Sequence, residues 1–568
     1  MELLEKSGKP SKLDYFIGLV ALFAFLLLFF QNTGFLKAYS HIIRWINLGI
    51  LLIFMFDVAI KYFASKNKRV YLAKNWLDLI VFIPLLRFIP FIENLPFYII
   101  LWQTILIFML ISRTKRATKL IAMLSFRPAQ LMLISFSFAI AVGTILLALP
   151  AATATGSEAT FIDALFTSTS AVCVTGLIVQ DTATYFSPFG QMVILALIQL
   201  GGLGIMTFSV SLALLMKRSF GPKESLEMRE VLDQDLMSNV KNLVLFILKM
   251  TLILELAGAL ILFLLWGKRF GNIFVSLYHA FFHSISAFCN AGFSTFSDSL
   301  IQFNNDMSTN LVIMFLVVMG GLGFLVIRDF YHNLRNFFSR TKDRRMKLRI
   351  QTKLVLRVSL LLIVIGTLLI FAFEKSRGFA GLRYDNQLLI SLFQSITTRT
   401  AGFNTFDIAK LSSATLFMMI VFMFIGASPG STGGGVKTTT VAVLWSTLAS
   451  ALRQEENVRV FKRSVPNEVV QKVIILFVVS ILLVVGFAML LLYIEQKPMR
   501  DVLFETVSAF GTVGLSTGLT PTLSKAGKLV VTLLMFIGRL GPLTIGYAFA
   551  RKRKPAKVVY AEEHVMIG

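Results

Sequence analysis

Four stretches decide how this chain folds: FTSTSAVCVTGL at 166–177, FHSISAFCNAGF at 282–293, FQSITTRTAGF at 393–403 and FETVSAFGTVGL at 504–515. Each joins apolar and hydroxyl-bearing residues to a closing small residue and a glycine. Their glycines, Gly176, Gly292, Gly402 and Gly514, are separated by 116, 110 and 112 residues. Self-similarity at a near-constant period is the signature of a repeat architecture. The sequence therefore predicts four copies of one structural unit.

Each stretch lies between two long apolar runs. A helix that spans a bilayer needs about 20 apolar residues, whereas the stretches supply roughly 12. Non-helical backbone at membrane depth is tolerated only inside protein or beside a water-filled cavity. The pattern predicts four pseudo-symmetric helix–pore loop–helix repeats around one central pore. Their expected bounds are 128–240, 241–352, 353–468 and 469–568.

The composition is that of an all-α polytopic membrane protein. Of the 568 residues, 56% are hydrophobic and 15% are charged, and the mean hydropathy is +0.77. A soluble domain carries roughly 25% charged residues, so a soluble enzyme, a secreted disulfide scaffold and a disordered chain are excluded. The two cysteines, Cys173 and Cys289, lie among apolar or small residues and indicate neither a disulfide framework nor a thiolate metal site.

The net charge of +25 follows from the loops. Lys and Arg gather in the connections 217–249, 328–357 and 453–472 and in the tail from Arg551 to Lys557. Cytoplasmic loops of membrane proteins carry such an excess. We expect a multi-pass protein of the bacterial cytoplasmic membrane, with both termini in the cytoplasm, surrounded by lipid and without a nucleic-acid partner.

The four turns are candidate cation ligands. The half-helices would point the negative ends of their dipoles toward the axis, and rings of backbone carbonyls replace an ion's hydration shell in selectivity filters. Small-residue helix packing explains neither the period nor the short half-helices. The predicted filter residues, with the cation at the glycines, are Val174, Thr175, Gly176, Asn290, Ala291, Gly292, Thr400, Ala401, Gly402, Thr512, Val513 and Gly514.

A glycine-rich stretch, FIGASPGSTGGGVKTTT at 424–440, interrupts the apolar run after the third turn. Its proline and glycines break a helix, and it lacks the GKS/T ending and the preceding strand of a phosphate-binding loop. A flexible constriction below the filter fits this position, and a simple kink stays open as the alternative. The predicted gate residues are Gly430, Ser431, Thr432, Gly433, Gly434, Gly435, Lys437 and Arg539.

Three of the basic residues stand at membrane depth or close to it. Arg539 lies inside the last apolar run, where a charge is costly and usually functional, and carbonyls of the glycine-rich stretch are its expected partners. Arg399, beside the third turn, is expected to brace the pore loop through external carboxylates. The sequence leaves open whether Lys437 faces the cytoplasm or the cavity.

Over about 130–568 the chain resembles the Ktr/Trk/HKT superfamily of potassium transporters, and in particular its KtrB-type membrane subunits. The strings that carry this resemblance include TSTSAVCVTGL, SAFCNAGFSTF, TTRTAGFNTFD, SAFGTVGLSTGLTP and GASPGSTGGGVKTTT. In that superfamily a serine at the first filter position accompanies sodium permeation, so Gly176 implies potassium as the substrate. The resemblance implies no covalent cofactor and leaves sodium open as an activator.

The same resemblance implies partners and a gating element. It implies a homodimer with one pore per subunit, with Ile567 and Gly568 at the dimer interface. It also implies a cytosolic RCK-type nucleotide-binding regulatory subunit, and a glycine-rich gate that Arg539 contacts. Whether the pathway is a channel or an ion-coupled transporter stays open.

Residues 1–127 depart from this family and predict four extra transmembrane helices. They resemble a voltage-sensor-like bundle, with Asp57 and Asp78 as acidic partners. The expected fourth helix carries no charge over 97–111, however, and Arg113, Arg116 and Lys119 follow only at its end. Few gating charges could therefore cross the field, and we expect a structural or regulatory appendage.

Two other classes of function fit less well. A membrane-embedded enzyme would need a convergent acid, base or metal set, and no His/Asp/Glu cluster lies within the expected spans. A secondary transporter with broken helices around a midplane site would favour a twofold repeat over a fourfold one.

Overall fold

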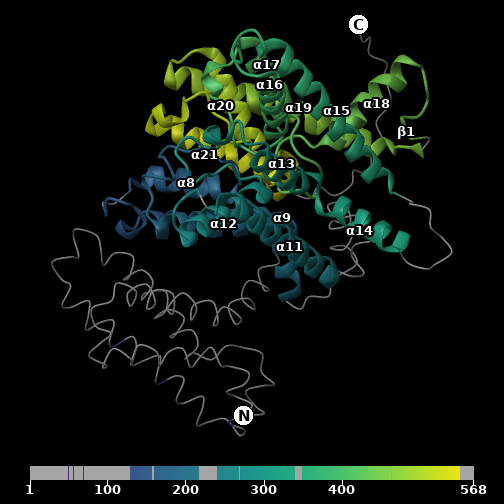
Figure 1. Ribbon diagram of the computed structural model, residues 1–568. Coiled ribbons are helices and arrows are strands. Elements are labelled where there is room, and N and C mark those ends of the chain that lie inside the picture. Colours follow the sequence, from purple (N-terminus) through teal and green to yellow (C-terminus); the bar gives the residue numbers. More distant parts are fainter. Residues whose placement is uncertain are drawn as a thin grey trace.

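The computed structural model describes residues 128–156, 159–215, 240–267, 269–338, 348–461 and 463–549, with positions 49, 56 and 68. Apart from those three positions, the helical bundle expected over 1–127 lies outside these residues, and so do the expected dimer contacts Ile567 and Gly568. The described part is a helical, polytopic membrane-type fold (Figure 1). Four of its helices are long and apolar enough to cross a bilayer, or up to six if each of two bent pairs is one span.

The helices follow one another in four groups, each with a long incoming helix, a short helix, a glycine turn and an outgoing helix. The first group is α7 (Pro128–Leu147), α8 (Phe161–Val172) and α9 (Pro188–Leu215). The second is α11 (Val240–Trp266), α12 (Ile273–Cys289), α13 (Met307–Leu322) and α14 (Phe324–Phe338). The third is α15 (Ile350–Glu374), α16 (Tyr384–Thr397), α17 (Ser413–Phe424) and α18 (Thr438–Leu452). The fourth is α19 (Asn467–Glu495), α20 (Met499–Gly511), α21 (Lys525–Leu540) and α22 (Pro542–Phe549).

One short hairpin departs from the expected all-helical fold. Strands β1 (Arg459–Val460) and β2 (Arg463–Ser464) pair antiparallel between α18 and α19. They lie at the same end of the molecule as α18 (Figure 1). Four single 3₁₀ turns, η2 (Pro150–Ala152), η4 (Ile301–Phe303), η5 (Ile408–Lys410) and η6 (Thr520–Thr522), lie in the connections.

A serine on the short helix joins it to the incoming helix in the first three groups. Each serine hydroxyl donates to a backbone carbonyl three residues before a glycine of that helix. The three bonds are Ser168 to Ile140 at 2.8 Å, Ser284 to Glu255 at 2.6 Å and Ser395 to Ile363 at 2.9 Å. A Cβ on Gly258 would lie 2.6 Å from the Ser284 hydroxyl, so the missing side chain lets the two helices approach.

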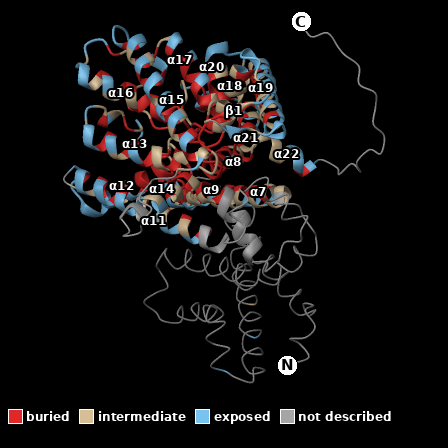
Figure 2. Cartoon of the chain, turned by 90° about the vertical axis from the view of Figure 1, so that its right-hand side faces the viewer, coloured by how far each residue is buried: buried red, intermediate tan, exposed pale blue. Residues whose placement is uncertain are grey.

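The four groups enclose a common core. Buried residues concentrate in the interior around α8, α20 and α21, and exposed residues cover the outer faces of α15, α16 and α17 (Figure 2). Large buried side chains such as Phe166, Phe288, Phe403 and Phe510 lie on or just after the short helices. Exposed leucines, isoleucines and valines line the long helices, as expected where the outer solvent is lipid.

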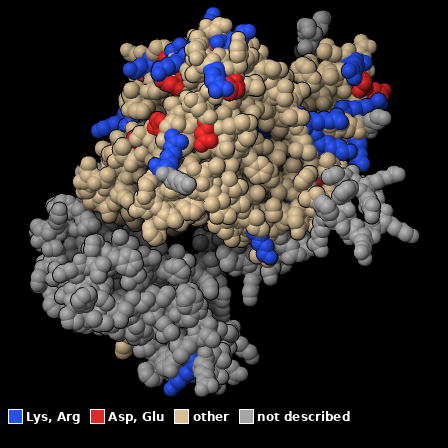
Figure 3. Space-filling view, in the orientation of Figure 1, with Lys and Arg blue, Asp and Glu red and all other residues tan. Residues whose placement is uncertain are grey.

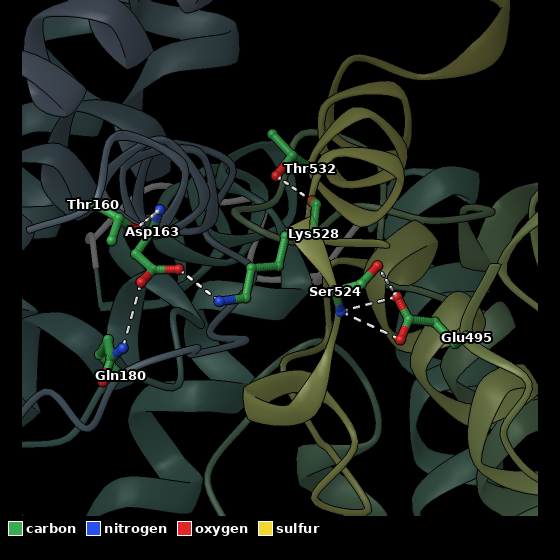
Figure 4. Close-up of polar contacts among 7 residues, drawn as sticks. All are labelled: Thr160, Asp163, Gln180, Glu495, Ser524, Lys528 and Thr532. Carbon is green, nitrogen blue, oxygen red and sulfur yellow. Dashed lines mark hydrogen bonds and ion pairs between the residues drawn. The ribbon is translucent and has the colours of Figure 1, made fainter. Parts of the chain in front are cut away.

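An ion pair links the first group to the last. Lys528 Nζ on α21 lies 2.7 Å from Asp163 Oδ1 in the first turn of α8 (Figure 4). The two side chains are 14% and 10% exposed. Between the first and second groups, Tyr278 donates to Gln191 at 2.6 Å, and Asn386 of the third donates to Asn305 of the second at 2.7 Å.

We predict that Asp163→Asn lowers the stability of the folded protein. The substitution leaves Lys528 without its carboxylate partner. We expect the free energy of unfolding to fall by about 1–3 kcal/mol, between the values for an exposed and a fully buried ion pair. Thermal unfolding in detergent measures it. Asp385→Asn is the matched control, because Asp385 pairs with Arg383 through side chains 62% and 82% exposed. Equal shifts in the two variants would contradict a structural role for the Asp163–Lys528 pair.

Candidate functional site

Each predicted filter turn bends through left-handed backbone. Its first residue has a φ of 54° at Val174, 59° at Asn290, 76° at Thr400 and 51° at Thr512. Its glycine has a φ of 91° at Gly176, 70° at Gly292, 79° at Gly402 and 91° at Gly514. Glycine adopts these angles readily, whereas for Val and Thr they are strained. The surrounding structure must therefore hold each turn in place.

Hydrogen bonds to the preceding short helix hold the turns. In each turn the N–H of the second residue donates to a backbone carbonyl of the short helix. The four bonds are Thr175 to Ser170 at 2.8 Å, Ala291 to Ser286 at 2.8 Å, Ala401 to Thr397 at 3.0 Å and Val513 to Ser508 at 2.9 Å. Side-chain hydroxyls add a second bond to each turn. Ser170 and Ser508 accept from the N–H groups of Gly176 and Gly514. Ser286 and Thr397 donate to the carbonyls of Phe293 and Phe403.

The four turns meet one another in a closed ring. A Cβ built on each glycine would meet the carbonyl oxygen that precedes a neighbouring glycine: Gly176 meets Ala291, Gly292 meets Ala401, Gly402 meets Val513 and Gly514 meets Thr175. The distances are 3.0 Å for Gly292 and 2.6 Å for Gly402. Four glycines and four carbonyl oxygens from four distant parts of the chain thus lie against one another.

The glycine-rich stretch forms a non-helical segment between α17 and α18, residues 425–437, which we call the intramembrane segment. Its two ends are tied together, since Gly426 donates to the Val436 carbonyl at 2.9 Å and Val436 donates to that of Phe424 at 3.3 Å. The segment also bonds α13, where Ser428 N–H donates to the Gly321 carbonyl at 3.1 Å.

This segment lies directly against the turns. The N–H of Gly434 donates to Thr512 Oγ1 at 2.9 Å. A Cβ on Gly433 would collide with the Thr400 hydroxyl. Thr400 and Thr512 are the first residues of the third and fourth turns, so in this conformation the segment covers one side of the ring.

Arg539 joins the intramembrane segment to α9 of the first group. Its Nη1 donates to the Thr432 carbonyl, and its Nη2 donates to the Gly201 carbonyl of α9 at 2.5 Å. The residue is 3% exposed, and it forms no ion pair with any carboxylate of the described residues. The contact with the glycine-rich stretch was predicted. The guanidinium therefore places a buried positive charge against the intramembrane segment, and its hydrogen-bond acceptors among the described residues are backbone carbonyls.

Two further basic residues have definite positions. Lys437 Nζ donates to the Gly433 carbonyl at 2.6 Å, so its side chain folds back onto the segment. The expectation for Arg399 is wrong. Its Nη2 donates to Ser359 Oγ on α15 at 2.9 Å, and no external carboxylate of the described residues pairs with it.

A family model described as a cation transport protein, TrkH, matches residues 97–559. The chain belongs to this TrkH family. The superfamily predicted from the motifs is therefore confirmed, and the chain is a membrane transport protein rather than an enzyme.

Named relatives cover most of this TrkH-family chain. It is 40% identical to the Ktr system potassium uptake protein B of Bacillus subtilis, over 80% of this chain and 100% of the relative. It is 35% identical to the potassium/sodium uptake protein NtpJ of Enterococcus hirae, over 78% and 97%. The crystal structure of the potassium transporter TrkH from Vibrio parahaemolyticus has the same fold, with a TM-score of 0.58 at 20% identity, over 74% of this chain and 83% of that one.

Two helix breaks in this TrkH-family protein were missed in the sequence. The second and fourth outgoing helices bend by 100° and 90° at Gly323 and Gly541, which have a φ of 90° and 84°. A Cβ on Gly323 would lie 2.6 Å from the Pro429 carbonyl. The bend at Gly323 thus brings α14 against the intramembrane segment, where Phe324 N–H donates to the Gly430 carbonyl at 2.9 Å.

Two polar clamps behind the ring were also missed. Glu505 lies nine residues before Gly514 and is 1% exposed; its carboxylate accepts from Ser516 and, at 2.8 Å, from Thr520. His283 lies nine residues before Gly292, and its Nε2 lies 2.9 Å from Ser294 Oγ. In both repeats a buried side chain of the short helix thus bonds the hydroxyl that stands two residues after the glycine.

We predict that Glu505→Ala lowers cation discrimination. It leaves the buried Thr520 hydroxyl and the half-buried Ser516 hydroxyl without their shared acceptor, which costs about 1–3 kcal/mol and frees the backbone after Gly514. Rubidium and sodium uptake in proteoliposomes measure the ratio, and Glu505→Gln should restore much of it. Glu495→Ala is the control. Glu495 accepts from Ser524 at 2.6 Å (Figure 4), away from the turns, so that variant should lose stability and keep its ratio. Equal ratios in both alanine variants would contradict the clamp.

Proposed function

We propose that this protein takes up potassium across the bacterial cytoplasmic membrane through one pathway per chain, with four pore repeats bounded as predicted. The ring of four turns is its selectivity filter. The observation that carries the proposal is the convergence of the Thr175, Ala291, Ala401 and Val513 carbonyls beside glycines whose Cβ positions are occupied. Backbone carbonyls are the ligands that replace the hydration shell of potassium in known filters.

The named relatives support the choice of ion. The Bacillus relative is a potassium uptake protein. The Enterococcus relative is named for the uptake of potassium and sodium. We include sodium in the proposal as an activator of potassium uptake. Glycine at all four filter positions, including Gly176, favours potassium as the ion carried.

The intramembrane segment is the proposed gate. It covers the ring at Thr400 and Thr512, and Arg539 holds it by the Thr432 carbonyl. A positive charge at this point opposes cation passage while the contact lasts. Opening then requires the segment to leave Arg539, and the glycines at 433–435 give it the backbone freedom to do so.

The proposed assembly rests on the motif resemblance. It is a homodimer, with a cytosolic nucleotide-binding regulatory subunit of the RCK type and both termini in the cytoplasm. On this orientation α14, the hairpin β1–β2 and the end of α18 lie toward the cytoplasm, where such a subunit would reach the gate through α14 and the bend at Gly323.

The filter proposal predicts that Gly402→Ser reduces the preference for potassium over sodium. A Cβ there would lie 2.6 Å from the Val513 carbonyl, so that carbonyl must turn away. Rubidium and sodium uptake of purified, folded variants measure the effect, which we expect to be at least tenfold in the ratio.

Gly381→Ser is the matched control. Gly381 has a φ of 86° and nothing within 4 Å of its Cβ position, so it carries the same backbone strain outside the ring. An unchanged ratio in folded Gly402→Ser would show that the ring is not the filter.

The gate proposal predicts that deleting Gly433–Gly435 raises flux several-fold. The deletion removes the bond from Gly434 to Thr512, and the shortened segment can no longer hold Thr432 against Arg539. Ion flux into proteoliposomes without a regulatory subunit measures it. Deletion of the exposed residues 154–156, which lie in neither the ring nor the intramembrane segment, serves as the control. The deletion variant must show the same thermal unfolding transition as the unaltered protein. If the flux through such a variant does not exceed that of the unaltered protein, the segment is not a gate.

A further inference from the structure

An apolar groove runs along one face of α18. Helices α17, α18, α19 and α20 line it, and its volume is about 710 Å³, within the range of small-ligand sites. From Val441 to Ala451 it follows α18 for about 15 Å. Its one hydroxyl, Thr447, already donates to the Val443 carbonyl. The groove therefore offers only apolar contacts, over the length of an extended hydrocarbon chain.

A basic pocket of about 440 Å³ adjoins the groove at the end of α18. Arg453 and Arg459 line it, with Glu455 and Ser450. Trp445 lines both spaces, so the groove and the pocket adjoin at this side chain. Lys and Arg side chains gather at this end of the molecule (Figure 3).

The two arginines of the pocket have no carboxylate partner among the described residues. Neither Arg453 nor Arg459 forms an ion pair within the described part of the chain, and the Glu455 carboxylate faces the Ser450 hydroxyl at 3.4 Å. Two guanidiniums against one carboxylate leave the pocket positive. An exposed tryptophan between an apolar groove and a basic pocket is typical of the membrane interface.

We propose that groove and pocket together bind one anionic phospholipid of the inner leaflet. Its phosphate lies between Arg453 and Arg459, and one acyl chain lies in the groove beside Trp445. Basic pockets between transmembrane helices on the cytoplasmic side suit such headgroups. Charge complementarity at the pocket, and an apolar groove that adjoins the pocket at Trp445, select this occupant. The assignment of leaflet uses the orientation proposed above, and the binding itself does not depend on the transport function.

The bound chain would support the gate from behind. Phe424 and Ile425, where the intramembrane segment begins, and Val441, just after it ends, all line the groove. The Phe424 ring stacks on Phe510 of α20 at 5.9 Å. An acyl chain in contact with both ends of the segment stabilises the conformation in which the segment covers the ring.

Binding is tested on the purified, delipidated full chain with phosphatidylglycerol and phosphatidylcholine of identical acyl chains. Native mass spectrometry counts the bound lipid, and thermal unfolding reports stabilisation. We expect one phosphatidylglycerol to be retained and to raise the unfolding temperature, with at least tenfold weaker retention in Arg453→Gln/Arg459→Gln. Ala451→Trp, which fills the groove, should abolish retention. The control Arg383→Gln/Arg500→Gln removes two arginines outside the pocket and should leave binding unchanged.

Three outcomes overturn the proposal. Equal retention of phosphatidylglycerol and phosphatidylcholine would show that the retained lipid is non-specific annular lipid and that the pocket does not select an anionic headgroup. Unchanged retention in Arg453→Gln/Arg459→Gln would show that the headgroup binds elsewhere. Efficient disulfide cross-linking between two copies of a Leu448→Cys variant in liposomes would show that a second subunit, and not a lipid, covers the groove.

Discussion

The ring depends on one steric constraint: at four points the backbone carbonyl of one repeat occupies the space where a neighbouring glycine would carry its Cβ. Only glycine permits this approach, and only left-handed backbone aims the turn correctly. The rest of each repeat fixes that geometry. The short helix ends just before its turn, hydrogen bonds from its last residues hold the turn, and a serine–glycine contact fixes the short helix to the incoming helix in three repeats.

The ring is built from carbonyl dipoles, whereas the intramembrane segment beside it is held by a charged side chain. A buried guanidinium, Arg539, is bound by carbonyls of Thr432 and Gly201 and by no carboxylate of the described residues. An ion pair would neutralise the charge, whereas carbonyl dipoles leave it able to repel a cation. In the gate that we propose, the arginine both fastens the intramembrane segment and opposes a cation while the segment is bound to it.

The sequence predicted those features whose signal is local. The sequence alone predicts the period of the glycines, the short half-helices and the broken outgoing helix. It also predicts the contact between Arg539 and the glycine-rich stretch. The bends at Gly323 and Gly541 were not visible, because one glycine in an apolar helix looks like any packing glycine. The Arg399 partner was wrong, since Ser359 lies 40 residues away and carries no charge. Glu505 and His283 share a register that alignment of the repeats could have revealed, but their partners follow the turn and depend on how it folds.

The central claim is that a cation sits inside the ring of carbonyls, and the most direct measurement is anomalous scattering from crystals of the full chain grown in rubidium. We expect a peak on the axis of the ring, bounded by the carbonyls of Thr175, Ala291, Ala401 and Val513. Excess potassium should displace it more readily than sodium does. If the crystals show rubidium peaks elsewhere in the protein and none in the ring, the ring is not a cation site.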